Sequence, residues 1–294
     1  MSRVYCSDAA RLRGDDNIAT AAHLDVWILV ELPITWGREP IRDAALPPAT
    51  RETLLRATQK IPRSRLVFIR RRVECLGTIR IFVVRSAPTI GIAMRDLPSI
   101  EDVANVDFVA MLNEVAPMTQ PIVLVCTHGQ HDSCCGRRGY PLFDALRNRN
   151  ELDVWQCSHI GGDRFAANAV VLPWGMYYGP VEARDANLLA DSIARNEIFL
   201  PGYRGRVSEP RPVQAAETFV RRTTNVLDRD AYELTTRETL VDGRMRITLR
   251  DTEGTQHEVT MEHYVAAENA MATCTTKEAA PIRQFRLIEY RIVD

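Results

Sequence analysis

The sequence of 294 residues has no long apolar run. No stretch of about 18 apolar residues occurs, and the start, MSRVYCSDAARLRGDD, contains no apolar core of a signal peptide. We therefore expect a cytoplasmic protein that does not associate with membranes. Neither sign of charge dominates, because 37 Lys and Arg residues stand against 38 Asp and Glu residues. Nucleic acid is therefore not expected as a partner.

Signatures of several enzyme classes are also missing. The chain has no G-x-G-x-x-G after a strand and no G-x-x-x-x-G-K-[ST], which argues against a self-contained dinucleotide or nucleotide enzyme. It also has no G-x-S-x-G and no H-E-x-x-H, the signatures of α/β-hydrolases and of zinc metalloproteases. Any chemical activity of this chain therefore depends on residues outside these motifs.

Cysteine and histidine are scarce but crowded. The chain has seven Cys and six His, and seven of these 13 residues lie between Cys126 and His159, in about a ninth of the chain. Each of these side chains can bind a metal, and a cysteine is also a nucleophile and a redox centre. In a reducing cytosol, clustered cysteines indicate metal binding or redox chemistry more than a set of disulfides.

Apolar runs and helical spacing alternate along the chain, which predicts a mixed α/β protein without internal repeats. Turn signals within alternating residues near the end predict an antiparallel β segment. We divide the chain into an α/β domain (1–116), a domain with the crowded motifs (117–228) and the antiparallel extension (229–294). The expected strands cover 24–32, 65–70, 78–85, 121–126, 152–157 and 168–173, and the expected helices cover 50–61, 100–114, 140–149, 185–197 and 211–227.

Four side chains in the crowded segment fit a single metal site. Cys126 ends the strand over 121–126, and Cys135 lies near the entrance of the following helix. His159 and Asp163 lie four residues apart in a loop that contains two glycines, which let the backbone approach an inorganic cluster closely. Two thiolates and two N/O donors would complete a four-ligand site, with Cys134 and Cys157 close by as alternates.

At these residues the chain resembles the sucrase/ferredoxin-like family. The likeness rests on CTHGQHDSCCGRRGYPL and VWQCSHIGGDRFAANAVVLPWGMYYGPV, and more weakly on PRPVQAAETFVRR and TWGRE. The resemblance implies a thioredoxin-like ferredoxin domain that binds a [2Fe–2S] cluster. It implies that Cys126 and Cys135 hold one iron and His159 the other, with Asp163 in the place of the fourth ligand. An iron–sulfur protein without an organic cofactor needs a redox partner protein as electron donor or acceptor.

The second motif departs from the family pattern. Members of the family with established ligands carry H-x3-H, whereas this chain has Asp163 at the second position. A carboxylate is harder and more anionic than an imidazole, so it should favour Fe(III) and lower the reduction potential. Cys134, His131 or water remain alternatives for the fourth ligand.

Other interpretations of the same residues stay open. Zinc accepts sulfur, nitrogen and oxygen donors, so the four side chains also fit a structural zinc site in a binding module. A thioredoxin-like thiol oxidoreductase is a further alternative, although the C-x-x-C spacing of thioredoxins is absent. The remaining cysteines, Cys6, Cys75 and Cys274, are interpreted as ordinary buried or partly buried thiols. The sequence predicts neither a substrate nor an oligomeric state.

Overall fold

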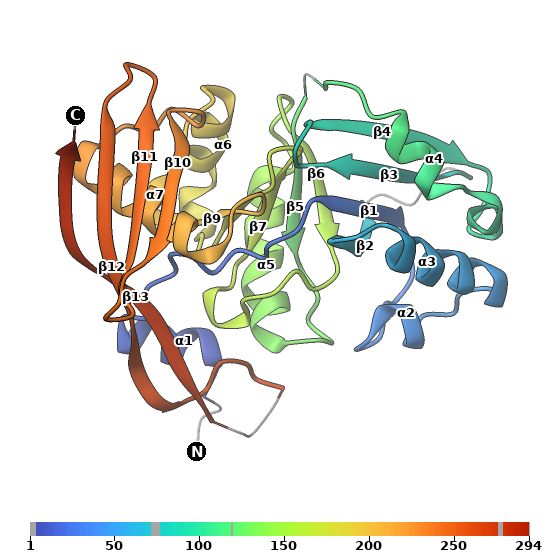
Figure 1. The fold of residues 1–294 in the computed structure, drawn as a ribbon. Helices are drawn as coiled ribbons and strands as arrows, with labels where there is room; N and C mark the ends of the chain where they lie inside the picture. Colours follow the sequence, from blue (N-terminus) through green and yellow to red (C-terminus); the bar gives the residue numbers. More distant parts are fainter. Residues whose placement is uncertain (1–3, 72–76, 119, 276–278, 294) are drawn as a thin grey trace.

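The structure is a computed structural model that describes residues 4–71, 77–118, 120–275 and 279–293. Its first nine strands are β1 (Val26–Glu31), β2 (Ser64–Arg70), β3 (Ile79–Arg85), β4 (Gly91–Leu97), β5 (Ile122–Cys126), β6 (Asp153–Cys157), β7 (Ala169–Leu172), β8 (Met176–Tyr178) and β9 (Tyr203–Arg206). They form one mixed sheet in the order β4-β3-β1-β2-β6-β5-β7-β8-β9. A separate sheet follows, so the predicted mixed α/β class with an antiparallel C-terminal segment is confirmed (Figure 1).

The described residues also form helices, some of which pack with the first half of the large sheet in one apolar core and with the second half in another. They are α1 (Cys6–Arg13), α2 (Pro40–Asp43), α3 (Pro48–Lys60), α4 (Phe108–Asn113), α5 (Ser133–Leu146), α6 (Ala186–Ala194) and α7 (Arg211–Thr224), with short 3₁₀ turns η1 (Glu101–Asn105), η2 (Asp163–Phe165), η3 (Ala183–Asp185) and η4 (Leu200–Gly202). The central strands β1 and β5 are buried at every position. Strands that are covered on both faces consist of continuous apolar residues, which is why their sequences show no polar alternation.

The large sheet contains the same strand order twice. In the first half, β1 pairs in parallel with β2 and antiparallel with β3, and β3 pairs antiparallel with β4. In the second half, β5 pairs in parallel with β6 and antiparallel with β7, and β7 pairs antiparallel with β8. Each half is a β–α–β unit followed by an antiparallel hairpin, which is the arrangement of the thioredoxin-like fold. The repeat is one of topology, since the sequence shows none.

The two halves meet where β2 and β6 end. These strands pair antiparallel through only two residue pairs, Ile69 with Cys157 and Arg70 with Gln156. The carboxyl ends of both parallel pairs therefore lie together, and the loop after β1 reaches the loop after β5. One sheet crosses the proposed boundary between residues 116 and 117, and the division of the chain into 1–116, 117–228 and 229–294 stays a prediction.

Two predicted helices differ from the structure. The helix expected over 140–149 begins at Ser133, because the Asp132 carboxylate accepts a hydrogen bond from the Cys134 N–H at 2.8 Å and caps the helix. The single helix expected over 100–114 is divided into η1 and α4, because Asp107 caps α4 in the same way. The helices α1 and α2 and the strands β4, β8 and β9 have no counterpart among the predictions.

The second sheet consists of β10 (Tyr232–Thr239), β11 (Met245–Asp251), β12 (Gln256–Ala270) and β13 (Ala280–Val293), all antiparallel. Its turns contain Gly243 and Gly254, which have φ of +85° and +92°. The apolar face packs on α7. The far end of the β12–β13 hairpin lies beside α1, near the N-terminus (Figure 1). Within the described ranges, no helix has the length and apolar character needed to cross a membrane.

Candidate metal centre

Strand β5 and helix α5 position the two thiols of the predicted site. Cys126 is the last residue of β5 and is buried, and Cys135 lies in the first turn of α5 and is buried as well. The helix packs very closely on the strand end at Gly139, where a Cβ atom would lie 1.9 Å from the Cys126 carbonyl oxygen. Only glycine allows this approach. Gly139, the second glycine of the GRRG stretch, therefore lets α5 pack directly on the end of β5.

The structure brings the four predicted side chains together. The ligand atoms of Cys126, Cys135 and His159 all lie within 4.8 Å of one another. The Cys135 Sγ lies 3.8 Å from the His159 Nδ1 and 3.4 Å from the Asp163 Oδ1, and the last two atoms are 3.1 Å apart. Their position is thus observed, while their role as ligands stays a prediction.

The three alternates have different surroundings. His131 stacks on His159 with ring centroids 3.9 Å apart, and its ring forms a second ligand group with His159 and Asp163. Cys157 lies opposite Cys126 in the β5–β6 ladder, inside the apolar core. Cys134 faces away from the site, since its Sγ lies 3.5 Å from the Sγ of Cys6. Cys75 lies outside the described residues.

The surroundings of the site stabilise the charged forms of Cys126 and His159. Hydrogen bonds from the Cys135 and Cys157 thiols hold the pKa of Cys126 well below its ordinary value. Burial disfavours a charged His159, but the hydrogen bond and charge of Cys126, together with Asp163, leave the pKa of His159 raised. Burial raises the pKa of Asp163, an effect that the charge of His159 opposes. A thiolate is the form of cysteine that binds metals.

Two arginines hold the His159–Gly162 loop by its carbonyl groups. Arg65 of β2 donates to the His159 oxygen at 3.1 Å and to the Ile160 oxygen at 2.9 Å. The buried Arg204 of β9 donates to the Gly161 oxygen at 3.1 Å. Gly161 and Gly162 have φ of +97° and +87°, a backbone conformation that residues with a side chain adopt only with strain. Sequence reasoning missed both arginines, because no local pattern marks a side chain that reaches a loop about 40 to 95 residues away.

The loop after β1 supports the site from the first half. The Nε2 of His128 donates to the Gly37 carbonyl at 2.6 Å, so its Nδ1 is free to accept from the His159 N–H at 3.1 Å. His131 contacts the Arg38 carbonyl through Nδ1 at 3.2 Å. Burial lowers the pKa of His128, in agreement with a neutral ring. The TWGRE stretch, which the sequence marked only as a weak likeness, is therefore part of the site's surroundings.

We expect Gly139→Ala to destabilise the protein although alanine is the better helix former. The added Cβ has no space against the Cys126 carbonyl, so α5 must move away from β5. Overpacking of this kind costs about 3 kcal/mol of unfolding free energy. The reverse change at an exposed position of the same helix, Ala145→Gly, should cost only about 1 kcal/mol through helix propensity. Urea unfolding of both variants measures the difference, and equal losses would contradict the close contact.

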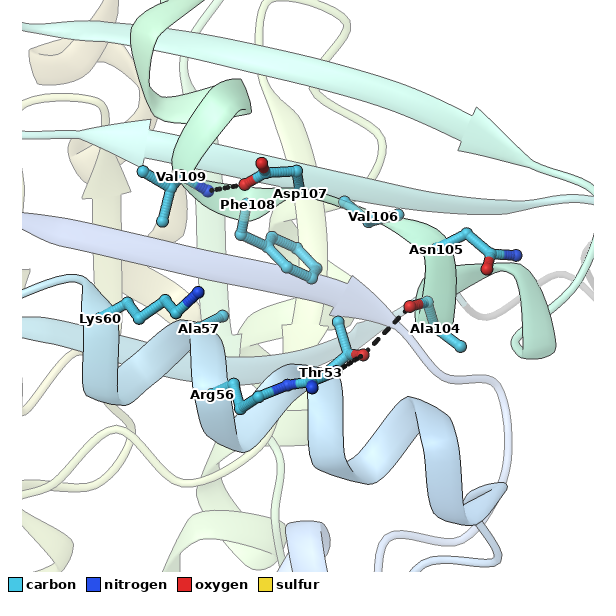
Figure 2. A pocket seen from close by; sticks show the side chains of 10 residues that line it. All are labelled: Thr53, Arg56, Ala57, Lys60, Ala104, Asn105, Val106, Asp107, Phe108 and Val109. Carbon is cyan, nitrogen blue, oxygen red and sulfur yellow. Dashed lines mark hydrogen bonds between the residues drawn. The ribbon is translucent and has the colours of Figure 1, made fainter.

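A separate pocket of about 230 Å³ lies on the first half, between α3 and the η1–α4 segment. Figure 2 shows its lining residues, among them Thr53, Arg56, Lys60 and Asp107. Thr53 donates to the Ala104 carbonyl, and Asp107 accepts from the backbone of α4, so both polar groups have structural partners. The pocket is lined by neither cysteine nor histidine, and we assign it no part in the metal centre.

Comparison with known proteins identifies one family and several partial relatives. The family model described as sucrase/ferredoxin-like matches residues 18–205. The proteins named "Altered inheritance of mitochondria protein 32" are similar over about 100 residues. The one from Eremothecium gossypii is 29% identical over 31% of this chain and 34% of its own length, and the one from Meyerozyma guilliermondii is 31% identical over 32% and 38%. The chain thus spans about a third of the length of these relatives.

Solved structures of a thioredoxin-like [2Fe–2S] ferredoxin from Aquifex aeolicus also match. One is 16% identical and covers 32% of this chain and 97% of the ferredoxin, with a TM-score of 0.29. The wild-type structure at 1.5 Å resolution is 17% identical and covers 29% and 97%, with a TM-score of 0.27. At such scores the match adds nothing to the topology described above.

Proposed function

This chain belongs to the sucrase/ferredoxin-like family, and we propose that it is an iron–sulfur protein that binds one [2Fe–2S] cluster and passes single electrons to or from a redox partner protein. The observation that carries the proposal is the convergence of two cysteines, a histidine and an aspartate from two loops at the carboxyl ends of β5 and β6. The name of the Aquifex aeolicus ferredoxin refers to the same kind of cluster.

The donor set fits an iron–sulfur cluster. Cysteine thiolates are the usual ligands, and histidine replaces cysteine at one iron of Rieske-type centres. Cys126 and Cys135 would hold one iron, and His159 and Asp163 would hold the other. When bound, the cluster would supply a one-electron redox couple. In this chain a carboxylate would be the fourth ligand, where the family pattern has a second histidine.

The surrounding residues can exclude water and keep the loops in place. Both thiols are buried, and the carbonyl bonds from Arg65 and Arg204 hold the second loop against the first. The Nδ1 of His159 faces the thiol and the carboxylate, so this nitrogen is the one placed to bind iron, and Nε2 is left to hold a proton. The protein thus offers a metal-binding nitrogen and a proton-binding nitrogen on one ring.

The histidine side of the site faces the surface. The side chain of His159 is 18% exposed and that of His131 is 21% exposed, whereas the two thiols are covered. Beside them, Trp36, Arg70 and Tyr140 line an open pocket of about 310 Å³ that also contains His128. We propose this face for the contact with the partner protein, because electrons pass most readily where the site lies nearest the surface.

Analysis of iron and sulfide tests the proposal. Protein purified anaerobically should contain about two irons and two acid-labile sulfides per chain, and should show the absorption and EPR spectra of a [2Fe–2S] centre. Stoichiometric zinc at this site without labile sulfide would reject the proposal in favour of a structural metal. Metal-free protein whose Cys126 and Cys135 form a reversible disulfide would favour thiol chemistry instead.

A further inference from the structure

A second group of ligand-type side chains lies outside the proposed cluster site. It consists of Cys6 in α1, Asp132 and Cys134 at the start of α5, and Cys274 between β12 and β13. Their ligand atoms all lie within 4.8 Å of one another. The group joins three segments that are far apart in the chain, since Cys134 lies 128 residues from Cys6 and 140 from Cys274. The sequence predicted ordinary thiols at Cys6 and Cys274.

The distances within this group match one tetrahedral ion. The Cys134 Sγ lies 3.5 Å from the Sγ of Cys6 and 3.5 Å from the Sγ of Cys274. The Cys6 Sγ lies 3.9 Å from the Asp132 Oδ2. Sulfur atoms that share one zinc ion at Zn–S bonds of about 2.3 Å lie about 3.8 Å apart in a tetrahedron. Small movements of the side chains would therefore place all four donors around one ion.

Hydrogen bonds to the sulfur and oxygen atoms orient the donors. The Ser7 hydroxyl donates to the Cys134 Sγ at 3.2 Å, and the Cys6 N–H donates to the Cys274 Sγ at 3.2 Å. The Asp132 Oδ2 accepts from the Cys274 N–H at 2.6 Å. Such donors stabilise negative charge on a thiolate or carboxylate, and groups of this kind around a metal hold its ligands in position.

Disulfide bonds do not account for the group. Three thiols cannot all pair in disulfides within one chain, and the sulfur atoms stand 3.5 Å apart rather than at the bonding distance of about 2.05 Å. Three sulfur donors with one carboxylate oxygen suit zinc, which is borderline-soft and accepts both.

We propose that Cys6, Cys134 and Cys274, with Asp132 as the fourth donor, bind a structural zinc ion that is separate from the iron–sulfur site. The ion would fasten α1 and the end of the β12–β13 hairpin to the first turn of α5 (Figure 1).

Metal analysis of the full chain tests this proposal. Protein purified without metal-affinity steps should contain about one zinc per chain in addition to iron. Cys6→Ser and Cys274→Ser should lose the zinc, and Cys274→His should keep it because an imidazole nitrogen can replace the thiolate. Cys274 is the least buried of the three thiols, so substitutions at this position should disturb the fold least. Cys75→Ser, a cysteine that neither site uses, is the matched control and should keep both metals.

The two metal sites can fail independently. Cys126→Ser should lose iron and keep zinc, whereas Cys274→Ser should lose zinc and keep the visible absorption of the cluster. Loss of zinc should also increase cleavage by proteases next to α1 and in the β12–β13 connection. Wild-type protein that contains iron but no zinc overturns the zinc site and leaves the proposed function standing. A disulfide between Cys6 and Cys274 in the intact mass, copper in place of zinc, or loss of iron in Cys274→Ser also overturns it.

Discussion

Replacement of either buried thiol of the cluster site removes the bound iron: this is the result we expect for Cys126→Ser and for Cys135→Ser. Each side chain would supply a thiolate to the cluster, Cys126 from the end of β5 and Cys135 from the first turn of α5. An iron–sulfur centre depends on its thiolate ligands more than on any other. Serine has nearly the same size, so the fold should persist while the visible absorption, iron and labile sulfide are lost.

Serine variants of cysteines outside the site are the controls for this result. Cys75→Ser and Cys274→Ser should keep the cluster, as Cys274 lies with Cys6 and Cys134 rather than with Cys126. Cys134→Ser is decisive for the choice within the vicinal pair. Full iron content in Cys135→Ser together with its loss in Cys134→Ser would mean that the ligand is Cys134, one residue earlier than we assign.

The variant Asp163→His should raise the reduction potential and make its dependence on pH steeper. Reduction adds negative charge near His159, whose free nitrogen then binds a proton more tightly, so the potential falls as pH rises. One proton per electron corresponds to a slope of about −59 mV per pH unit. With His159 alone, the wild-type slope should be no steeper than this across about pH 6 to 9, because a carboxylate must be deprotonated to bind iron and Asp163 would therefore carry no proton as a ligand.

Voltammetry of three proteins measures this effect. A second imidazole at residue 163 can take up a further proton, and it replaces an anionic ligand by a neutral one, which accounts for both the steeper slope and the higher potential. In His159→Cys, loss of the titrating ring should flatten the slope, and the added thiolate should lower the potential. An unchanged pH profile in Asp163→His would show that residue 163 does not touch the cluster, and His131, which stacks on His159, would then be the next candidate.

The local part of the site followed from the sequence. The apolar run over 121–126 predicts a buried strand, and such a strand necessarily delivers Cys126 at one edge of the sheet. The loop after Cys126 is short and leads into a helix that packs on the same strand, so Cys135 at the start of this helix lies close to Cys126. The glycines before Asp163 predicted a tight loop, and both indeed have positive φ. These features depend on residues that are close in sequence, because strand burial, helix capping and glycine geometry determine the local conformation there.

The sequence by itself therefore determined the family, the α/β class and the segment in which the predicted metal ligands lie, because spacing and local conformation carry that information. Only the tertiary structure decided which residues from distant parts of the chain contact this segment. The pairing of β2 with β6 brings the Gly37–Arg38 turn onto His128 and His131, and it turns two sequence-unrelated halves into one sheet. The return of the β12–β13 hairpin to α1 places Cys274 beside Cys6 and Cys134. Such contacts arise from the packing of whole elements, for which no short pattern in the chain is a sufficient signal.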